Sequence, residues 1–563
     1  MFELFLVHLA ILFFCISAGF LFYRVLPGEQ GWQRPLVMLF FTGLVIYSSI
    51  AQVIALFFPV NFIVQLLLIL ITLLLLALNR KSFIPFLRSV YSSALRMRPL
   101  YLIAITSCWI LVLVICAGPI INDDTDCYHI PMVKWISEYG TVPGLANLHS
   151  RYGFNSSWFM SISVLTPQGL IGQFYTSLNS LISFVFTAYL ISKLANPRFA
   201  LSAAVVLVLS LASWPVIRGN ATSAGYDLIT AFMVIVLLME SLRLVVEKSG
   251  RHFTTELLLW PVFLFSIRIV NFPLLILSAA SVYLLWRANR KQLMILAACS
   301  LLIIIPFLIR NLILSGYLFF PSMAVDLFAV DWKADPDRTK RLVDFIRYFN
   351  RVNTRYQETE VTAGLSYSQW IPLWFRYMFN YDKLIFFPAV AGIFVALAGL
   401  RKTFFSGSLV YRLFIATFLL QLLLWFFVAP DPRFALGPIL SFCFLLVFIP
   451  ITIPVSWTRL LVIPVALCCL SLAAYSVFAR RDSISRIIVH PLPLPVPGAQ
   501  PILIGNIPVY LPARFQDNFN LRCYGTELPC LYEIYPGLEM RGPSIKNGFR
   551  LSKTRDKSKA SGL

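Results

Sequence analysis

Residues 101–131 read YLIAITSCWILVLVICAGPIINDDTDCYHIP, and this stretch decides how the chain is built. Its first part, Tyr101–Ile121, is apolar and long enough to cross a membrane as a helix, which takes about 20 residues. The run ends in the acidic cluster NDDTD, residues 122–126. Carboxylates at the mouth of a membrane helix are costly unless they are hydrated, paired or functional, so we treat them as candidate site residues.

The composition places the chain among polytopic membrane proteins. Of its 563 residues, 59% are hydrophobic and 13% are charged, and long apolar runs recur to about Phe478. We therefore predict an all-α polytopic transmembrane helix bundle of about 14 helices. The predicted helices span residues 3–23, 35–58, 61–78, 101–121, 170–194, 199–217, 226–246, 254–270, 272–286, 292–310, 382–400, 411–429, 434–453 and 457–478.

The net charge of +21 does not indicate nucleic-acid binding. Most basic residues lie in short loops between apolar runs, as the positive-inside rule expects of a membrane protein. The first apolar run lacks a basic leading segment and a small-residue cleavage site, so it is predicted to be a retained helix.

The basic loops predict the orientation. Five basic residues crowd the loop 79–98, which is therefore predicted to be cytoplasmic, so the acidic cluster at the other end of helix 101–121 faces outside. The segments 254–270 and 272–286 could form one long helix. Counting them as two keeps the later basic loops on the cytoplasmic side, which favours two.

Three parts follow from this topology: an N-terminal three-helix segment with a basic loop (1–100), a transmembrane core with external loops 122–169 and 311–381 (101–478), and a C-terminal extramembrane tail (479–563). The basic end of the tail argues against an external location, but long segments follow the charge rule poorly, and we assign the tail to the outside. There Cys523 and Cys530 can form a disulfide if the compartment is oxidising.

The loop 122–169 holds the densest chemistry of the chain. Residues 133–139 alternate apolar and polar side chains at helical spacing, which predicts a short helix on the outer membrane surface, with Trp135 and Tyr139 at headgroup depth. Polar side chains precede and follow it. They are Tyr128, His129, Lys134, His149 and Arg151.

An aspartate in this loop is suited to general-base chemistry, because it can accept a proton from an acceptor hydroxyl within hydrogen-bond reach. Neighbouring acids push one another's pKa apart. The alternative is a solvated acidic loop that only ends a helix. Asp124, Asp126, His129 and His149 are also suitable metal ligands, but no tight ligand spacing supports a metal site, so no metal ligand is predicted and a divalent metal stays open.

Four arginines are predicted at outer helix ends: Arg218, Arg268, Arg310 and Arg433. A guanidinium binds phosphate oxygens in a bidentate fork, which suits a lipid-phosphate donor. The alternative for each is contact with the headgroups of bulk lipid. Asp227 begins a helix, where a carboxylate is favourable by electrostatics alone or lines the site.

The stretch Asp124–Pro131, with the pattern Asp-x-x-x-Tyr-His-x-Pro, resembles the first external loop of GT-C superfamily glycosyltransferases, in an uncharacterised bacterial branch. The run Arg310–Tyr317, which includes Asn311, is similar to a stretch in the same bacterial proteins. The resemblance implies that Asp124 is the catalytic base, Asp126 its helper and Asp123 the next candidate. The family typically reaches this loop after one helix and this chain after four, so the first three helices would be an addition.

The resemblance implies an inverting membrane glycosyltransferase that moves a sugar from a polyprenyl-phosphate donor to an envelope glycan or lipid acceptor. We expect it in the bacterial inner membrane, with the site facing the periplasm or exterior. Donor phosphate binding is assigned to Arg310, Arg433 and Arg218, and substrate binding to Tyr128, His129, Lys134, His149, Arg151, Asp227 and Asn311.

Two rival functions stay open. One is a transporter or flippase for a lipid-linked or anionic solute, and the other is a non-catalytic component of polysaccharide assembly. A transporter should show repeats and charges near the bilayer midplane, whereas the charges here gather at one face, which favours the enzyme.

Overall fold

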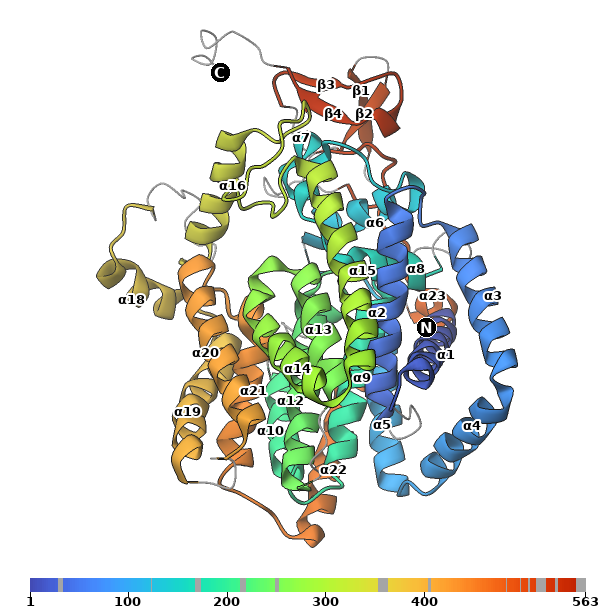
Figure 1. Cartoon of the computed structure of the whole chain (residues 1–563), viewed down its shortest axis with the longest axis vertical. Coiled ribbons are helices and arrows are strands. Elements are labelled where there is room, and N and C mark those ends of the chain that lie inside the picture. Colours follow the sequence, from blue (N-terminus) through green and yellow to red (C-terminus); the bar gives the residue numbers. More distant parts are fainter. Residues whose placement is uncertain are drawn as a thin grey trace.

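The computed structural model describes residues 1–28, 34–122, 124–167, 174–212, 219–248, 253–352, 363–402, 407–481, 484–496, 498–504, 507–512, 523–531 and 535–552. It is mostly α-helical, with the apolar helices packed in a bundle and the strands and several short helices at one end (Figure 1). This arrangement confirms an α-helical membrane bundle. A helix satisfies its backbone hydrogen bonds within the segment itself, which a chain that crosses hydrocarbon requires.

Each predicted apolar segment contains a helix. These helices are α1 (Phe2–Val25), α2 (Leu36–Ala55), α3 (Phe62–Leu78), α5 (Pro99–Cys116), α9 (Ser177–Lys193), α10 (Ala200–Ala212), α12 (Asp227–Val246), α13 (Thr254–Ile267), α14 (Leu275–Ala288), α15 (Arg290–Ser315), α19 (Asn380–Lys402), α20 (Leu409–Val428), α21 (Leu436–Phe448) and α22 (Val455–Phe478). Within the described residues, nine spans are long and apolar enough to cross a membrane, or ten if the bent pair that begins with α3 forms one. The predicted number of fourteen crossings is not confirmed, because α10, α13 and α21 are short.

The predicted pair 254–270 and 272–286 is two helices. α13 ends at Ile267, the turn η4 (Ile269–Leu274) follows, and α14 runs back beside α13. Arg268 lies at this break in an extended conformation. The break therefore places Arg268 at the end of the bundle that also holds the loop 122–169, which we call the acidic loop.

The basic loop 79–98 is not irregular. It forms α4 (Arg80–Leu95), which is bent by 95° from α3. Asn79 stands between the two helices, and the phenyl rings of Phe83 and Phe86 on α4 pack against Phe20 of α1. The opposite face of α4 carries exposed apolar and basic side chains, among them Leu87, Arg88 and Leu95.

The loop after α5 folds into short elements. They are η2 (Thr125–His129), α6 (Ile130–Glu138), α7 (Leu145–Leu148), η3 (Ser150–Gly153) and α8 (Ser157–Leu165). Ser156 caps α8 by accepting a hydrogen bond from the Trp158 amide at 3.2 Å. Trp135 of α6 is fully buried, so the prediction that this helix exposes Trp135 on the membrane surface is wrong.

The later segments contribute the remaining elements. The predicted loop 311–381 contains α16 (Pro336–Phe349) and α18 (Tyr367–Tyr377), and the tail contains α23 (Ile484–Val489), β1 (Ala499–Ile504), β2 (Ile507–Pro512), β3 (Leu538–Met540), η7 (Ile545–Asn547) and β4 (Phe549–Leu551). The strands form two antiparallel pairs, with Ala499 opposite Pro512 in one and Leu538 opposite Leu551 in the other.

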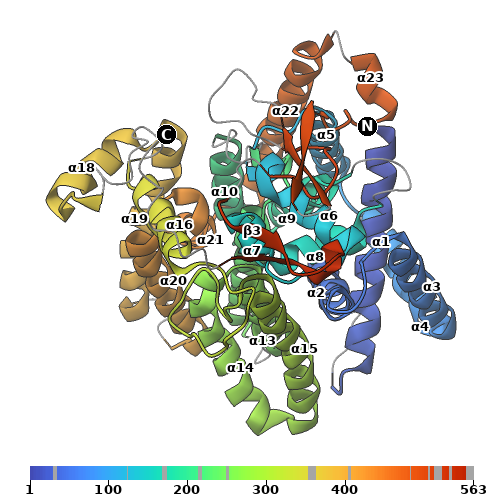
Figure 2. The same cartoon turned by 90° about the horizontal axis from the view of Figure 1, so that it is seen from above.

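The tail covers the acidic loop (Figures 1 and 2). The amide of Phe549 donates to the carbonyl of Pro143 at 3.0 Å, and the hydroxyl of Tyr152 donates to the carbonyl of Cys530 at 2.8 Å. Gly144 has a positive φ of 68°, and the carbonyl of Phe549 leaves no room there for a side chain. Tail and loop therefore lie on the same side of the bundle, where Cys523 and Cys530 form the disulfide that the sequence allowed.

Candidate functional site

The carboxylate of Asp124 lies between two arginines that come from distant parts of the chain. Asp124 stands at the start of η2, and its Oδ1 accepts a hydrogen bond from Nη1 of Arg151 at 2.8 Å. Its Oδ2 is 3.6 Å from Nη1 of Arg433. The side chain of Asp124 keeps 26% of its surface exposed, so this ion-paired carboxylate stays open to solvent and to a ligand.

Opposing effects set the charge of Asp124. Burial raises the pKa of this carboxyl, whereas the guanidinium groups of Arg433 and Arg151 lower it and prevail, so that the pKa lies below the ordinary value of 3.8. Asp124 is therefore ionised at neutral pH and can accept a proton.

Arg433 is held by its own turn. In η5 (Pro432–Ala435), the Oδ1 of Asp431 accepts from the Arg433 amide at 3.0 Å, and the Oδ2 of Asp431 lies 3.1 Å from Nε of Arg433. The tight turn thus fixes the guanidinium while leaving Nη1 directed at Asp124. Asp431 was missed as a site residue from the sequence, although its position two residues before Arg433 is the pattern of a side chain that caps a turn.

A second ion pair adjoins the first. Nη1 of Arg268 lies 3.0 Å from Oδ1 of Asp227, which begins α12. The guanidinium of Arg268 stacks over the ring of Phe434 at 3.9 Å, and that of Arg433 lies 4.7 Å from the same ring. The structure therefore brings Asp227 into the site with Arg268, which the sequence indicated only if two helices span 254–286.

Aromatic rings form one wall of the site. The guanidinium of Arg151 lies 5.5 Å from the Tyr128 ring centroid, and the rings of Tyr128 and His129 are 4.3 Å apart. His129 also contacts Tyr226, at 5.9 Å, another residue that the sequence did not single out. Burial lowers the pKa of His129 to about 3 despite the opposing charge of Asp124, so its ring is neutral and cannot supply a proton at pH 7.

Two predicted binding residues support the loop rather than face a ligand. The Nδ1 of His149, which is 1% exposed, accepts from the Arg151 amide at 3.0 Å and so helps to orient Arg151. The ammonium group of Lys134 donates to the carbonyl of Thr526 in the tail, and burial lowers the pKa of Lys134.

Arg310 and Asn311 bind other parts of the chain. Arg310 is 1% exposed; its Nε donates to Oγ1 of Thr141 at 3.1 Å and its Nη1 to Oδ1 of Asn155 at 2.9 Å. The amide of Asn311 donates to the carbonyl of Leu318 at 2.8 Å. Arg310 thus fastens the acidic loop to α15 and makes no contact with Asp124.

Of the other predicted site residues, one lies within the described part of the chain and two lie outside it. Asp126 is described and fully buried, beside Thr125, whose hydroxyl accepts from the Ala224 amide at 3.3 Å. Asp123 and Arg218 lie outside the described residues. Among the described residues, no three His, Cys, Asp or Glu side chains are grouped as they would be to hold a metal ion.

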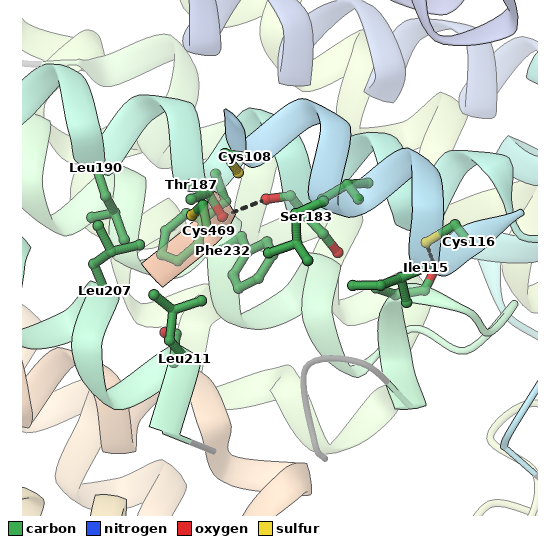
Figure 3. Close-up of a pocket in the computed structure, with 15 residues that line it drawn as sticks. Cys108, Ile115, Cys116, Ser183, Thr187, Leu190, Leu207, Leu211, Phe232 and Cys469 are labelled. Atoms are coloured by element: carbon green, nitrogen blue, oxygen red, sulfur yellow. Dashed lines mark hydrogen bonds between the residues drawn. The ribbon is translucent and has the colours of Figure 1, made fainter. Parts of the chain in front are cut away.

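An apolar cavity of about 30 Å³ lies among α5, α9, α10, α12 and α22 (Figure 3). Cys116 and Ile115 lie at one end and Leu190, Leu207 and Leu211 at the other. Cys116 contacts the carbonyl of Ala221, three residues before Ala224, whose amide binds Thr125. The cavity therefore ends close to the loop that carries Asp124.

A second, smaller cavity of about 10 Å³ adjoins Asp431 on the other side of the site. Its lining residues come from α16, α18, α19 and the turn before α21. They are Asn350, Trp374, Met378, Asp382, Pro430, Asp431 and Pro432.

One protein-family model matches residues 1–440, and its description is a domain of unknown function (DUF8201). The match includes every site residue named above and excludes the tail. No curated protein and no solved structure matches the chain.

Proposed function

The chain belongs to the DUF8201 family, and we propose that it is an integral membrane glycosyltransferase that moves a sugar from a polyprenyl-phosphate donor to a glycan or lipid acceptor. The ion-paired but accessible Asp124 is the observation that carries this proposal. General-base transfer needs a carboxylate that a hydroxyl can reach, with fixed cations close by for the departing phosphate. Asp124, Arg151 and Arg433 meet this requirement, and the resemblance of 124–131 to GT-C loops agrees with it.

In the proposed reaction, Asp124 takes the proton of the acceptor hydroxyl while that oxygen attacks the anomeric carbon of the donor. The bond between this carbon and the phosphate oxygen breaks, and polyprenyl phosphate leaves with its electrons and its negative charge. Attack from the face opposite the leaving group inverts the anomeric centre. Arg433 stabilises the charge that develops on the phosphate.

Arg433 couples donor binding to base strength. Asp431 fixes the guanidinium, and its contact with Asp124 is long, at 3.6 Å, so a donor phosphate can bind it in place. Because Arg433 is one of the charges that lower the pKa of Asp124, a phosphate that offsets this charge raises that pKa. The carboxylate then becomes a stronger base when the donor is bound.

The apolar cavity supports a lipid-linked donor. Its lining is apolar, it lies among membrane helices, and it ends near Thr125, the neighbour of Asp124. The cavity, at about 30 Å³, is much smaller than a polyprenyl chain, so a hydrocarbon chain would have to part these helices to present its phosphate end to the arginines, with the site on the external face.

The test is transfer by the full chain reconstituted in lipid nanodiscs, with a panel of polyprenyl-phosphate sugars as donors and a membrane glycan extract as acceptor. We expect Asp124→Asn to slow transfer by about a hundredfold or more, because the amide cannot accept the proton. The matched control is Asp337→Asn, which changes an exposed aspartate of α16. Equal rates for Asp124→Asn and wild type would refute the proposed base, and lipid translocation without transfer would favour a flippase.

A further inference from the structure

Asp382 is a buried carboxylate that lacks a partner. It is the third residue of α19, only 6% of its surface is exposed, and its carboxylate makes no hydrogen bond or ion pair within the described part of the chain. A buried charge is normally paired, hydrogen-bonded or bound to a metal, because removing it from water is costly. A positively charged group beside Asp382 would offset that cost.

The smaller cavity shows where that partner would lie. Asp382 and Asp431 both line it, and its space suits about one water-sized group rather than a sugar or a lipid. Asn350 lines the same cavity and is 7% exposed; its amide nitrogen donates to the carbonyl of Ile346 at 2.6 Å, which leaves the amide oxygen as a further ligand. The side chains of Asn350, Asp382 and Asp431 can thus contribute oxygen atoms, while the indole N–H of Trp374 is bound to the carbonyl of Pro430.

We propose that Asp382 and Asp431 hold a hard divalent cation, of the Mg²⁺ or Mn²⁺ type, with Asn350 as a third oxygen ligand. Oxygen ligands select such ions. Magnesium in particular is commonly bound by one or two protein carboxylates, with water and substrate phosphate completing its shell. A site with two carboxylates agrees with this coordination preference.

The cation joins the site through a shared residue. Asp431 binds Arg433 at 3.1 Å, and Arg433 approaches Asp124 at 3.6 Å. An ion beside Asp431 therefore lies next to the arginine assigned to the leaving phosphate. This last step rests on the proposed function: the ion would share the donor phosphate with Arg433, whereas the binding of the ion itself does not depend on it.

The experiment measures binding of Mn²⁺ to the full chain in nanodiscs by electron paramagnetic resonance, after metal is removed with a chelator. We expect one saturable Mn²⁺ site, competed by Mg²⁺, and a loss of affinity of at least about tenfold in Asp382→Asn. Asp337→Asn serves as the matched control and should bind as the wild type does. Nanodiscs without protein give the lipid background.

Three outcomes would overturn the cation site. They are no binding above the lipid background, unchanged affinity in Asp382→Asn, or displacement of Mn²⁺ by ethanolamine but not by Mg²⁺, which would assign the cavity to an amine. If Asp382→Asn does not fold, Asn350→Ala gives the second test and should weaken Mn²⁺ binding severalfold. No donor is needed, so a failure of sugar transfer and a failure of metal binding are separate results.

Discussion

The two ends of α12 hold acidic groups in opposite ways. At one end, Glu240 is fully buried; its Oε1 accepts from the ammonium of Lys193 and, at 2.9 Å, from the hydroxyl of Tyr189, while its Oε2 accepts from Arg243 at 2.8 Å. At the other end, Asp227 pairs with Arg268 in the site that also holds Asp124, and Asp124 has one firm and one long ion pair and a side chain that is 26% exposed.

This difference separates a carboxylate that the fold saturates from one that can still bind a ligand. Every oxygen of Glu240 is occupied by the protein itself, so nothing remains for a ligand. Asp124 has incomplete partners and solvent access, which a ligand can complete. Counting charged residues in membrane helices would rank the two sites alike, whereas their hydrogen bonds do not.

The largest expected effect is at Glu240, whose carboxylate oxygens are all occupied by the protein itself. Glu240→Gln removes the fully buried charge that pairs with the partly buried Lys193 and Arg243, so we expect the free energy of unfolding to fall by about 3–5 kcal/mol. Thermal unfolding of the purified chain measures it. Glu247→Gln removes the exposed neighbour that pairs with Arg243 and should cost about 1 kcal/mol or less. Similar losses in both variants would erase the contrast between the two ends.

The next effect is at the open end. Arg433→Ala removes the cation assigned to the leaving phosphate, and we expect the rate of transfer to fall by about a hundredfold to a thousandfold. Initial rates at saturating donor measure it. Arg341→Ala, which changes an exposed arginine of α16, is the control. A fall in donor affinity without a fall in maximal rate would instead assign Arg433 to ground-state binding.

A smaller effect concerns pH. Asp124 must be ionised to act, and its pKa in the donor-free protein lies below 3.8, so transfer at low donor concentration should be lost only as the pH falls through that lowered pKa. The ion pair stabilises the fold above the unfolded pKa and is lost over the same acid range. Arg151→Gln removes one lowering charge, so the acid limb of the rate profile should move to higher pH.

The rate of transfer should show no step from His129 across the neutral pH range. Since burial lowers the pKa of His129 to about 3, no histidine step from this ring is expected between pH 5 and 8. Rates measured across that interval check it. A sigmoid step near pH 6.5 that disappears in His129→Gln would show that this ring titrates in the working enzyme.

The sequence predicted what depends on local pattern. Apolar run length indicated the helices, and the break near Arg268 followed from the distribution of basic loops. The turn around Arg433 was predicted at a helix end because the segment between the two apolar runs is too short for anything but a tight turn. Each of these features is decided within a few residues, and the structure agrees with each.

What the sequence could not predict depends on distant contacts. The pairing of Asp124 with Arg151 and Arg433 joins segments far apart in the chain. Arg310 looked like a phosphate ligand until its contacts with Thr141 and Asn155 were known. The tail covers Trp135, and the ring centroids of Phe549 and Trp135 are 6.2 Å apart. No sequence pattern near Trp135 indicates this contact.

The bend of 95° between α3 and α4 has a mechanical consequence. A helix that turns across the bundle axis, with exposed Leu87 and Leu95 beside Arg88, suits the boundary between hydrocarbon and headgroups. At that boundary α4 would set the depth of the bundle in the membrane. A thinner bilayer would then have to deform around the longer helices, because α4 stays at the headgroup level.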